Sequence, residues 1–409
     1  MRLTDIVGKV NMANENLKKA KKSKNDEFYT QYSDIQKEIN AYLDYNPKVF
    51  KDKTILLPCD DPEWSNFTKF FAQNFERFGL KKLISTSYAI ESKNLQSYCQ
   101  LSLLEQNSSR FDENKTKIKG KIFTLEKDIT GDGKINIEDL EWDYLEGDGD
   151  FRSKEVTKLR NEADIIITNP PFSLFREFLE WLFETDKQFV IIGNKNCITY
   201  KETFSRIKNN KMWVGKTPMG TDLLFRVPDE DELKRTKKIG SGYRLINGVA
   251  FARSQSIWYT NLDHGKRHQP LQLMTMLDNI KFSSHKSIRE HKYPKYDNYD
   301  AIEVPFTDAI PSDYDGVMGV PITFLDKYCP EQFEIIALGN LNGFNPNKYY
   351  INPISHIKGK ENKNEMINSV LTLRGEDKKG NYYTADNINY HIFAPYARIL
   401  IKRKVSNEN

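Results

Sequence analysis

Cysteine is scarce in this sequence, and the four that occur in 409 residues lie far apart, at Cys59, Cys99, Cys197 and Cys329. They form no Cys-x-x-Cys pair, which argues against a zinc site and a disulfide framework and fits a reducing compartment. Long apolar runs are absent too, since no stretch approaches the roughly 18 residues of a membrane-spanning helix. The first residues carry no apolar signal segment. We therefore expect a soluble, cytoplasmic protein.

The sequence also lacks an excess of one charge. Its 61 lysines and arginines nearly balance 57 aspartates and glutamates, so the net charge of +4 alone says little about a nucleic-acid partner. The charges are nevertheless segregated, with basic clusters in residues 18–24 and 266–295 and an acidic run in residues 128–150. Such segregation favours one positive cleft on a chain of modest net charge. Solvated surface lysines are the alternative.

The apolar runs that do occur are short and alternate with amphipathic helical patterns. These runs are residues 54–57, 81–86, 163–168 and 189–193. The alternation is typical of βαβ units around a parallel sheet. The sequence thus predicts an α/β fold with a doubly wound, mostly parallel, Rossmann-like sheet. Residues 249–253 and 256–262 are candidates for an antiparallel pair at its edge.

The length predicts two domains. A basic, flexible arm covers residues 1–25, and the sheet domain covers residues 26–262, with a polar insertion at about residues 91–147. Residues 263–409 are basic, contain histidines and are rich in tyrosine and proline. They predict a separate α+β region.

A buried strand is followed directly by Asn169-Pro170-Pro171-Phe172. Doubly wound sheets bind ligands beyond the carboxyl ends of their strands, where this tetrapeptide is expected. The Asn169 side-chain oxygen and the Pro170 carbonyl are two acceptors suited to the hydrogens of a planar amine such as that of adenine. By localising the nitrogen lone pair, they would favour attack on the methyl group of a sulfonium donor and stabilise the positive charge that develops.

The other residues of the tetrapeptide suit the same chemistry. The prolines restrict the backbone and so hold both acceptors in place before the base arrives. Phe172 offers a face on which an extruded base can stack, worth about 1–3 kcal/mol. Neither a metal nor a strong general base is required, so no metal site is predicted. The alternative is a rigid strand-to-helix turn with Phe172 in the core.

Longer motifs surround the tetrapeptide: DEFYTQY at residues 26–32, GDGDFRS at residues 147–153 and TNPPFSLFREF at residues 168–178. In this order they resemble the EcoRI-type adenine-specific DNA methylases, over most of residues 18–262 and more weakly to the carboxyl terminus. The resemblance implies a methyltransferase sheet, S-adenosylmethionine as cofactor, duplex DNA as substrate and residues 263–409 as the target-recognition region. It also implies roles for two sets of residues: an adenine pocket of Asn169, Pro170, Pro171 and Phe172, and closure over the methionine end of the cofactor by Phe28, Tyr29 and Thr30.

On the cofactor side the sequence departs from many methyltransferases. Residues 58–62, Pro-Cys-Asp-Asp-Pro, follow the first strand without the glycines that let a backbone approach a cofactor closely. Asp60 or Asp61 is the candidate partner of the cofactor's ammonium group, with helix capping as the alternative.

The resemblance places a second acidic motif beside the cofactor. Asp150 and Phe151 match the family's position next to the cofactor adenine. The alternative is a polar turn built on Gly147 and Gly149. No acidic residue can be assigned to the ribose hydroxyls.

Residues 128–139 approximate the spacing of a calcium loop, with oxygen-bearing side chains at positions one, three, five and twelve and Gly133 at position six. Position three is Thr130, however, and position twelve is Asp139 in place of a bidentate glutamate. These departures favour an acidic turn over a calcium site.

The basic region beyond residue 263 contains the candidates for DNA contacts. Arg267, Arg289 and Lys292 are expected to touch the DNA backbone, whereas no base-reading residue can be chosen from the sequence. In a bacterial restriction-modification system, a cognate endonuclease would act on the same site without binding this chain. The sequence leaves monomer and dimer open.

Two other functions share parts of the pattern. RNA guanine-N2 and protein-glutamine methyltransferases also hold a planar amine with Asn-Pro-Pro-[Phe/Tyr], but the DEFYTQY motif and the basic region favour DNA. A non-catalytic DNA-binding protein on the same scaffold is the other alternative. The intact tetrapeptide argues against it.

Overall fold

The computed structural model describes residues 29–60, 65–89, 110–221, 223–226, 243–246, 249–340 and 344–404. The chain forms two compact units: unit 1 comprises residues 1–195 and 214–264, and unit 2 comprises residues 196–213 and 265–409. The expected arm at residues 1–25 lies outside the described residues. The proposed boundary near residue 262 stays a prediction, and the inclusion of residues 196–213 in unit 2 was not anticipated. Within the described residues, no helix is long and apolar enough to cross a membrane.

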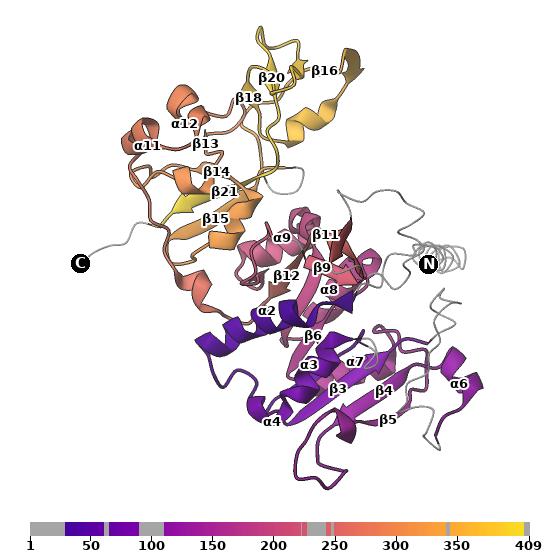
Figure 1. Ribbon diagram of the computed structural model, residues 1–409. Helices are drawn as coiled ribbons and strands as arrows, with labels where there is room; N and C mark the ends of the chain where they lie inside the picture. Colours follow the sequence, from indigo (N-terminus) through magenta and orange to yellow (C-terminus); the bar gives the residue numbers. More distant parts are fainter. Residues whose placement is uncertain are drawn as a thin grey trace. The chain divides into compact units, whose positions relative to one another are not determined.

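Unit 1 is built on an eight-stranded sheet with the order β5-β4-β3-β2-β6-β7-β12-β8 (Figure 1). Its centre consists of four parallel strands, β3 (Lys82–Ser87), β2 (Thr54–Leu57), β6 (Ile165–Thr168) and β7 (Gln188–Asn194). Antiparallel strands extend both ends: β4 (Lys121–Leu125), β5 (Glu141–Tyr144) and β12 (Ser256–Thr260), with β8 (Trp213–Val214) at the edge. The predicted α/β fold around a parallel sheet is confirmed.

The strand order creates a switch point in the middle of this sheet. From β2 the chain goes first to β3 on one side and later to β6 on the other. The crevice beyond the carboxyl ends of two such strands is the usual ligand site of open α/β sheets. The ends of β2 and β6 therefore mark the expected site.

Side chains from both faces of the sheet are buried, which explains the continuous apolar runs. Alternate residues such as Ile55 and Ile165 join the aromatic core of α2 (Tyr32–Tyr45), α3 (Asn66–Gln73) and α4 (Phe75–Phe78). Helix α7 (Lys154–Glu162) precedes β6 in the chain, and α8 (Phe175–Phe183) follows it. In α3, Phe67, Phe70 and Phe71 are almost fully buried, each contributing about 1.5–3 kcal/mol.

A second, antiparallel sheet in unit 1 has the order β1-β9-β11-β10. Its strands are β1 (Tyr29–Thr30), β9 (Leu223–Arg226), β11 (Val249–Ser254) and β10 (Tyr243–Ile246). The expected antiparallel pairing of residues 249–253 with 256–262 is wrong, because β11 pairs with β9 and β10 whereas β12 pairs with β7. The described part of unit 1 also contains α6 (Glu113–Ile118) and a 3-10 turn, Ile137–Asp139.

Unit 2 has two further sheets. One has the order β13 (Ile302–Glu303), β14 (Met318–Pro321), β21 (Arg398–Arg403), β15 (Phe333–Leu338). The other has the order β17 (Lys360–Lys363), β16 (Ile354–Ile357), β19 (Tyr382–Thr384), β20 (Ile392–Phe393), β18 (Leu373–Arg374). The α-helices in the described residues of this unit are α9 (Lys201–Lys208), α11 (Met276–Phe282) and α12 (Lys286–His291).

Candidate functional site

Three sequence-predicted segments meet at the carboxyl edge of the central strands. Asp60 follows β2, and Asn169 follows β6 directly. Helix α7 leads through a short connection into β6 and so begins at this same edge, with Asp150 just before it. The backbone N–H of Ala89, beyond the end of β3, donates to the Asp148 carbonyl at 2.8 Å and fixes that loop beside the strand end.

The Asn-Pro-Pro-Phe segment forms a rigid corner between β6 and α8. Asn169 is half-buried, and its Oδ1 atom is shielded from solvent. Pro170 is buried, and the Pro171 carbonyl accepts from the Leu174 N–H at 3.0 Å, so that a 3-10 turn, Phe172–Leu174, starts at once. Phe172 is half-buried and packs partly against the core of unit 1. The adenine-pocket role of all four residues stays a prediction.

Asp60 is the centre of a buried hydrogen-bond network. Asp60 is only 5% exposed, and both of its carboxylate oxygens accept hydrogen bonds from hydroxyl groups. Ser65 Oγ donates to Oδ1 at 2.7 Å, and Thr168 Oγ1 donates to Oδ2 at 2.6 Å. Because Thr168 is the last residue of β6, one carboxylate joins the turn after β2 to the residue before Asn169.

The backbone of Asp60 is held as firmly as its side chain. Its N–H donates to the Thr86 carbonyl at 3.1 Å, and its carbonyl accepts from Thr68 Oγ1 at 3.3 Å and from the Ser85 hydroxyl. The Thr68 Oγ1 and Ser85 Oγ atoms lie 3.0 Å apart, within hydrogen-bond distance. No role was predicted for these hydroxyl groups. For Ser85 and Thr168, the available signal was the polar ending of two otherwise apolar strands.

Helix capping and the predicted cofactor role are not exclusive for this turn. Ser65 caps α3, since its Oγ accepts from the Phe67 N–H at 3.1 Å while donating to Asp60. Asp61 lies outside the described residues. A contact of Asp60 with a cofactor ammonium group stays a prediction.

Strand β1 brings the DEFYTQY motif to α3. The Asn66 side chain donates through Nδ2 to the Thr30 carbonyl at 2.7 Å. Thr30 is only 3% exposed, and among the described residues its hydroxyl oxygen has no hydrogen-bond partner. Tyr29 pairs with Arg226 in the small sheet, and Phe28 lies outside the described residues. A buried, unpartnered hydroxyl beside the Asp60 turn fits a polar ligand such as the methionine end of S-adenosylmethionine.

Asp150 and Phe151 are engaged with the neighbouring helices. Arg152 donates to Asp150 through Nε at 2.9 Å and Nη2 at 2.6 Å. Phe151 is 3% exposed and packs edge-on against Phe178 at 5.0 Å and Trp181 at 5.6 Å between ring centroids. Contacts of Asp150 and Phe151 with the cofactor adenine stay predictions.

The glycine before Asp150 is required by both conformation and space. Gly149 has φ +83°, and a β-carbon there would lie 2.2 Å from the Ser87 carbonyl oxygen. Gly120 lies on the other side, where a β-carbon would be 2.6 Å from both Gly149 Cα and the same oxygen. Gly147 has open space around it. Gly149 thus allows the acidic loop to lie against the end of β3.

The loop at residues 128–139 turns its carboxylates onto its own backbone. Asp128 accepts from the N–H groups of Gly131 at 2.6 Å and Gly133 at 2.8 Å. Asp139 accepts from the N–H groups of Asn136 and Thr130 at 3.0 Å, and these hydrogen bonds hold the pKa of its carboxyl at about 2. No group of His, Cys, Asp and Glu suited to a metal ion occurs among the described residues. The arrangement is that of a self-capped acidic turn.

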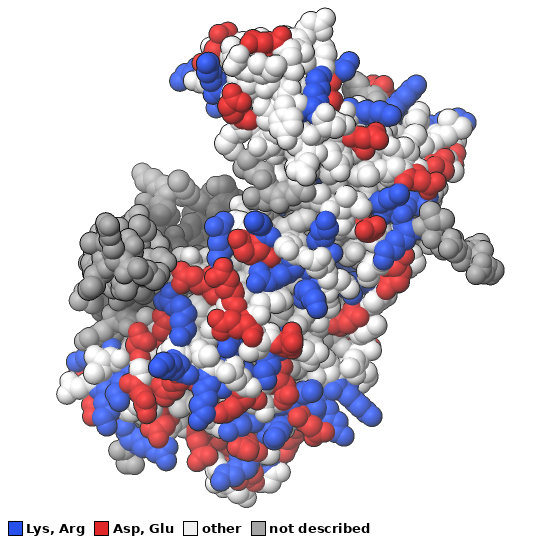
Figure 2. Space-filling model, turned by 180° about the vertical axis from the view of Figure 1, so that it is seen from behind, with Lys and Arg blue, Asp and Glu red and all other residues white. Residues whose placement is uncertain are grey.

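The three predicted DNA-contact residues differ in exposure. Arg289 and Lys292 are exposed, on α12 and at its carboxyl end. Arg267 is only 7% exposed; it bonds to the Asn210 side chain and lies 4.0 Å from the centre of the Trp213 ring. All three roles stay predictions. On the face shown in Figure 2, lysine and arginine side chains are interspersed with acidic ones.

Comparison with known proteins gives a consistent result. A family model described as adenine-specific methyltransferase EcoRI matches residues 16–404. The type II methyltransferase M.EcoRI of Escherichia coli is 44% identical over 329 residues, covering 80% of this chain and 90% of that protein. The type II methyltransferases M.MpnI of Mycoplasma pneumoniae and M.MgeORF184P of Mycoplasma genitalium are 35% and 36% identical, each over 78% of this chain and 84% of the relative. No solved structure matches the chain.

Proposed function

Because the chain belongs to the EcoRI family of adenine-specific methyltransferases, we propose that it transfers a methyl group from S-adenosylmethionine to the N6 amine of an adenine in duplex DNA. The relatives are type II methyltransferases. We therefore assign the chain to the modification arm of a type II restriction-modification system. Because its DNA substrate lies in the bacterial cytoplasm, we expect the enzyme to act there.

The observation that carries the proposal is the Asn169-Pro170-Pro171 corner at the switch point of the parallel sheet. A flat amine entering this crevice would donate its two hydrogens to Asn169 Oδ1 and the Pro170 carbonyl. These acceptors localise the nitrogen lone pair and stabilise the positive charge that develops on nitrogen. The corner is rigid before the base arrives, so little reorganisation is needed.

S-adenosylmethionine, when bound, supplies an electrophilic methyl group on a sulfonium. Thr30, Asp60 and the backbone around Asn66 are the residues we expect to hold its methionine end, because a buried hydroxyl and a buried carboxylate lie on adjoining segments. Asp150 is the expected neighbour of its adenine. Phe172 would stack on the target adenine, which must leave the duplex to reach the corner.

The decisive experiment offers tritiated S-adenosylmethionine and the purified chain separately to duplex DNA, ribosomal RNA and a release factor. We expect label in DNA, recovered as N6-methyladenine after digestion. Label in RNA guanine or in protein glutamine would establish the alternative methyl acceptors and overturn the proposal. Long-read sequencing of DNA from a host that expresses the chain then identifies the target sequence.

A substitution tests the assigned chemistry. Asn169→Ala should lower kcat by at least about 100-fold, by analogy with removal of one transition-state hydrogen-bond partner, and leave the Kd for S-adenosylmethionine unchanged. Asn261→Ala is the matched control: this half-buried asparagine bonds to Lys187 and Phe189, at the opposite edge of the sheet. Near-normal turnover of Asn169→Ala would remove Asn169 from the mechanism.

A further inference from the structure

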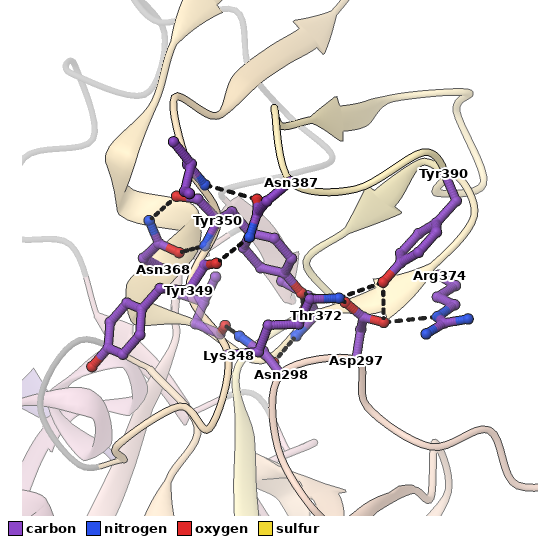
Figure 3. A network of polar contacts seen from close by, with 12 residues as sticks. Asp297, Asn298, Lys348, Tyr349, Tyr350, Asn368, Thr372, Arg374, Asn387 and Tyr390 are labelled. Atoms are coloured by element: carbon purple, nitrogen blue, oxygen red, sulfur yellow. Dashed lines mark hydrogen bonds and ion pairs between the residues drawn. The ribbon is translucent and has the colours of Figure 1, made fainter.

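Unit 2 contains a buried carboxylate, Asp297, that organises four polar side chains from separate strands and loops (Figure 3). The Asp297 side chain is 1% exposed. Its Oδ2 atom accepts from Lys348 Nζ and from the Tyr350 hydroxyl, both at 2.9 Å. Its Oδ1 atom accepts from the Tyr390 hydroxyl at 2.8 Å and from Arg374 Nε at 2.7 Å.

The carboxylate is fixed in its ionised state. Burial raises the pKa of Asp297, but the hydrogen bonds from Lys348, Arg374, Tyr390 and Tyr350 outweigh it and lower the pKa to about 2. The backbone is fixed as well, because the Asp297 N–H donates to the Thr372 carbonyl at 2.8 Å. Asp297 therefore stays ionised throughout the physiological pH range.

Arg374 is the one member of this network that combines restraint with exposure. Its Nε atom is bound to Asp297, and its guanidinium carbon lies 4.2 Å from the centre of the Tyr390 ring. The side chain is nevertheless 67% exposed. Figure 3 shows the guanidinium at the outer side of the network.

The charge around Arg374 suits an acceptor ligand. Two cations, Lys348 and Arg374, share the single carboxylate of Asp297, so this group of three side chains carries one excess positive charge. The nearby acids are engaged elsewhere: Glu376 bonds to His391 at 3.0 Å, and Asp377 caps the turn that ends at Asn381. A planar guanidinium fork matches a pair of acceptor atoms.

We propose that Arg374 is a DNA-contacting residue of this chain, held in a fixed orientation by Asp297 and Tyr390. The inference rests on the proposed function, because duplex DNA is the ligand it names. Two acceptor pairs on DNA have the required chemistry, the O6 and N7 atoms of guanine and the oxygens of a phosphate. A guanine contact would make Arg374 a specificity determinant, and a phosphate contact would make it a positioning contact.

The test measures binding of the full chain to two duplexes as salt is varied. One duplex contains the sequence that the chain methylates, and the other has the same base composition in scrambled order. If Arg374 reads guanine, Arg374→Ala weakens binding to the target about 5- to 150-fold and hardly changes binding to the scrambled duplex. If Arg374 holds a phosphate, both duplexes lose affinity alike, and the slope of log K against log salt falls by about one.

Two further variants separate geometry from charge. Lys378→Ala removes an equal charge from an exposed residue that has no side-chain partner in the described part of the chain, so it controls for bulk electrostatics. Arg374→Lys keeps the charge but loses the planar fork; it should recover the salt slope without recovering any lost discrimination. Thermal unfolding of each variant verifies that it is folded.

The outcomes are distinguishable from failure of the proposed function. If the wild-type chain methylates DNA and Arg374→Ala binds both duplexes as Lys378→Ala does, the proposal for Arg374 is overturned and the methyltransferase assignment stands. If the wild-type chain methylates no DNA, the proposed function fails, and the assignment of a DNA ligand to Arg374 fails with it.

Discussion

A single hydroxyl group, that of Thr168, connects the two halves of the candidate site. It donates to Asp60 across 108 positions of sequence, and the residue that carries it is fully buried. Thr168 immediately precedes Asn169, so the carboxylate after β2 restrains the start of the Asn-Pro-Pro-Phe corner. We expect Thr168 to position Asn169 without touching the base.

Substitution of Thr168 should show this role in the kinetics. Thr168→Val removes the donor and leaves a buried carboxylate oxygen with one partner fewer, at a cost of about 1–3 kcal/mol in the free energy of unfolding. We expect kcat to fall about 10-fold or more, with an unchanged KM for DNA, and Thr168→Ser to restore it. Steady-state kinetics and urea unfolding measure the two effects.

The control for this substitution is Thr260→Val. Thr260 is equally buried, and its hydroxyl donates to the Phe189 carbonyl at 2.8 Å, where β7 begins. It should lose stability without losing turnover. Equal losses of kcat in both valine variants, or a serine variant as slow as the valine variant, would count against a positioning role for Thr168.

At the scale of elements, the conformation of the acidic loop before α7 depends on a glycine. Gly149 adopts a positive φ and lies too close to Ser87 for a side chain. Gly149→Ala should therefore destabilise unit 1 by at least about 1–3 kcal/mol, because it combines an unfavourable φ with a collision. Chemical denaturation would measure this loss, and Gly147→Ala, in open space, should be nearly neutral.

The turn at residues 128–139 gives a pH-dependent prediction. The pKa of Asp139 is about 2, below its ordinary value of 3.8, so its contribution to stability is complete above pH 4 and declines as the pH falls toward 2. Wild type should exceed Asp139→Asn in unfolding free energy at pH 6, and the difference should shrink on acidification. Urea unfolding at successive pH values measures it; a difference that stays constant would contradict the assignment.

The same turn predicts the response to calcium. Asp128 and Asp139 already accept hydrogen bonds from five backbone N–H groups, those of Ile129, Thr130, Gly131, Gly133 and Asn136. Binding a cation there would require those bonds to break. We expect millimolar calcium or a chelator to leave the melting temperature unchanged, and a calcium-dependent rise of several degrees would establish a metal site.

Elements were predictable from the sequence where their pattern is local. The runs at residues 54–57 and 163–168 became parallel strands because both faces of the sheet are covered, which makes the whole run apolar. Strands β11 and β12 were assigned to each other wrongly because their partners, β9 and β7, are set by long-range packing. The link between Asp60 and Thr168 could not be predicted either, because the polar ending of β6 does not show which residue, 108 positions away, accepts its hydrogen bond.

At the scale of the molecule, the two units predict separate responses to the cofactor. All residues that we expect to hold S-adenosylmethionine belong to unit 1. At 100 times its Kd the cofactor adds about 2.7 kcal/mol to the stability of the unit that binds it. For a unit of that size this raises Tm by roughly 5–10 °C. Differential scanning calorimetry should show one transition that shifts and one that does not.

Nothing in the sequence indicated that residues 196–213 belong to unit 2. Helix α9 follows β7 in the chain with a typical βα spacing, yet it packs against β15 of unit 2. The periodicity of a helix shows that one face is buried, but it does not show which partner covers that face. A cofactor-dependent shift of both calorimetric transitions would contradict the independence of the two units.

The shared carboxylate of Asp60 determines how the residues around it should be varied in protein engineering. Ser65 and Thr168 both donate to the Asp60 carboxylate, so the effects of changes at positions 60, 65 and 168 are expected to be non-additive. Libraries that aim at a new cofactor or a new acceptor base should therefore vary these three positions jointly. The same holds in unit 2 for position 374, because Arg374 shares the Asp297 carboxylate with Lys348, Tyr350 and Tyr390.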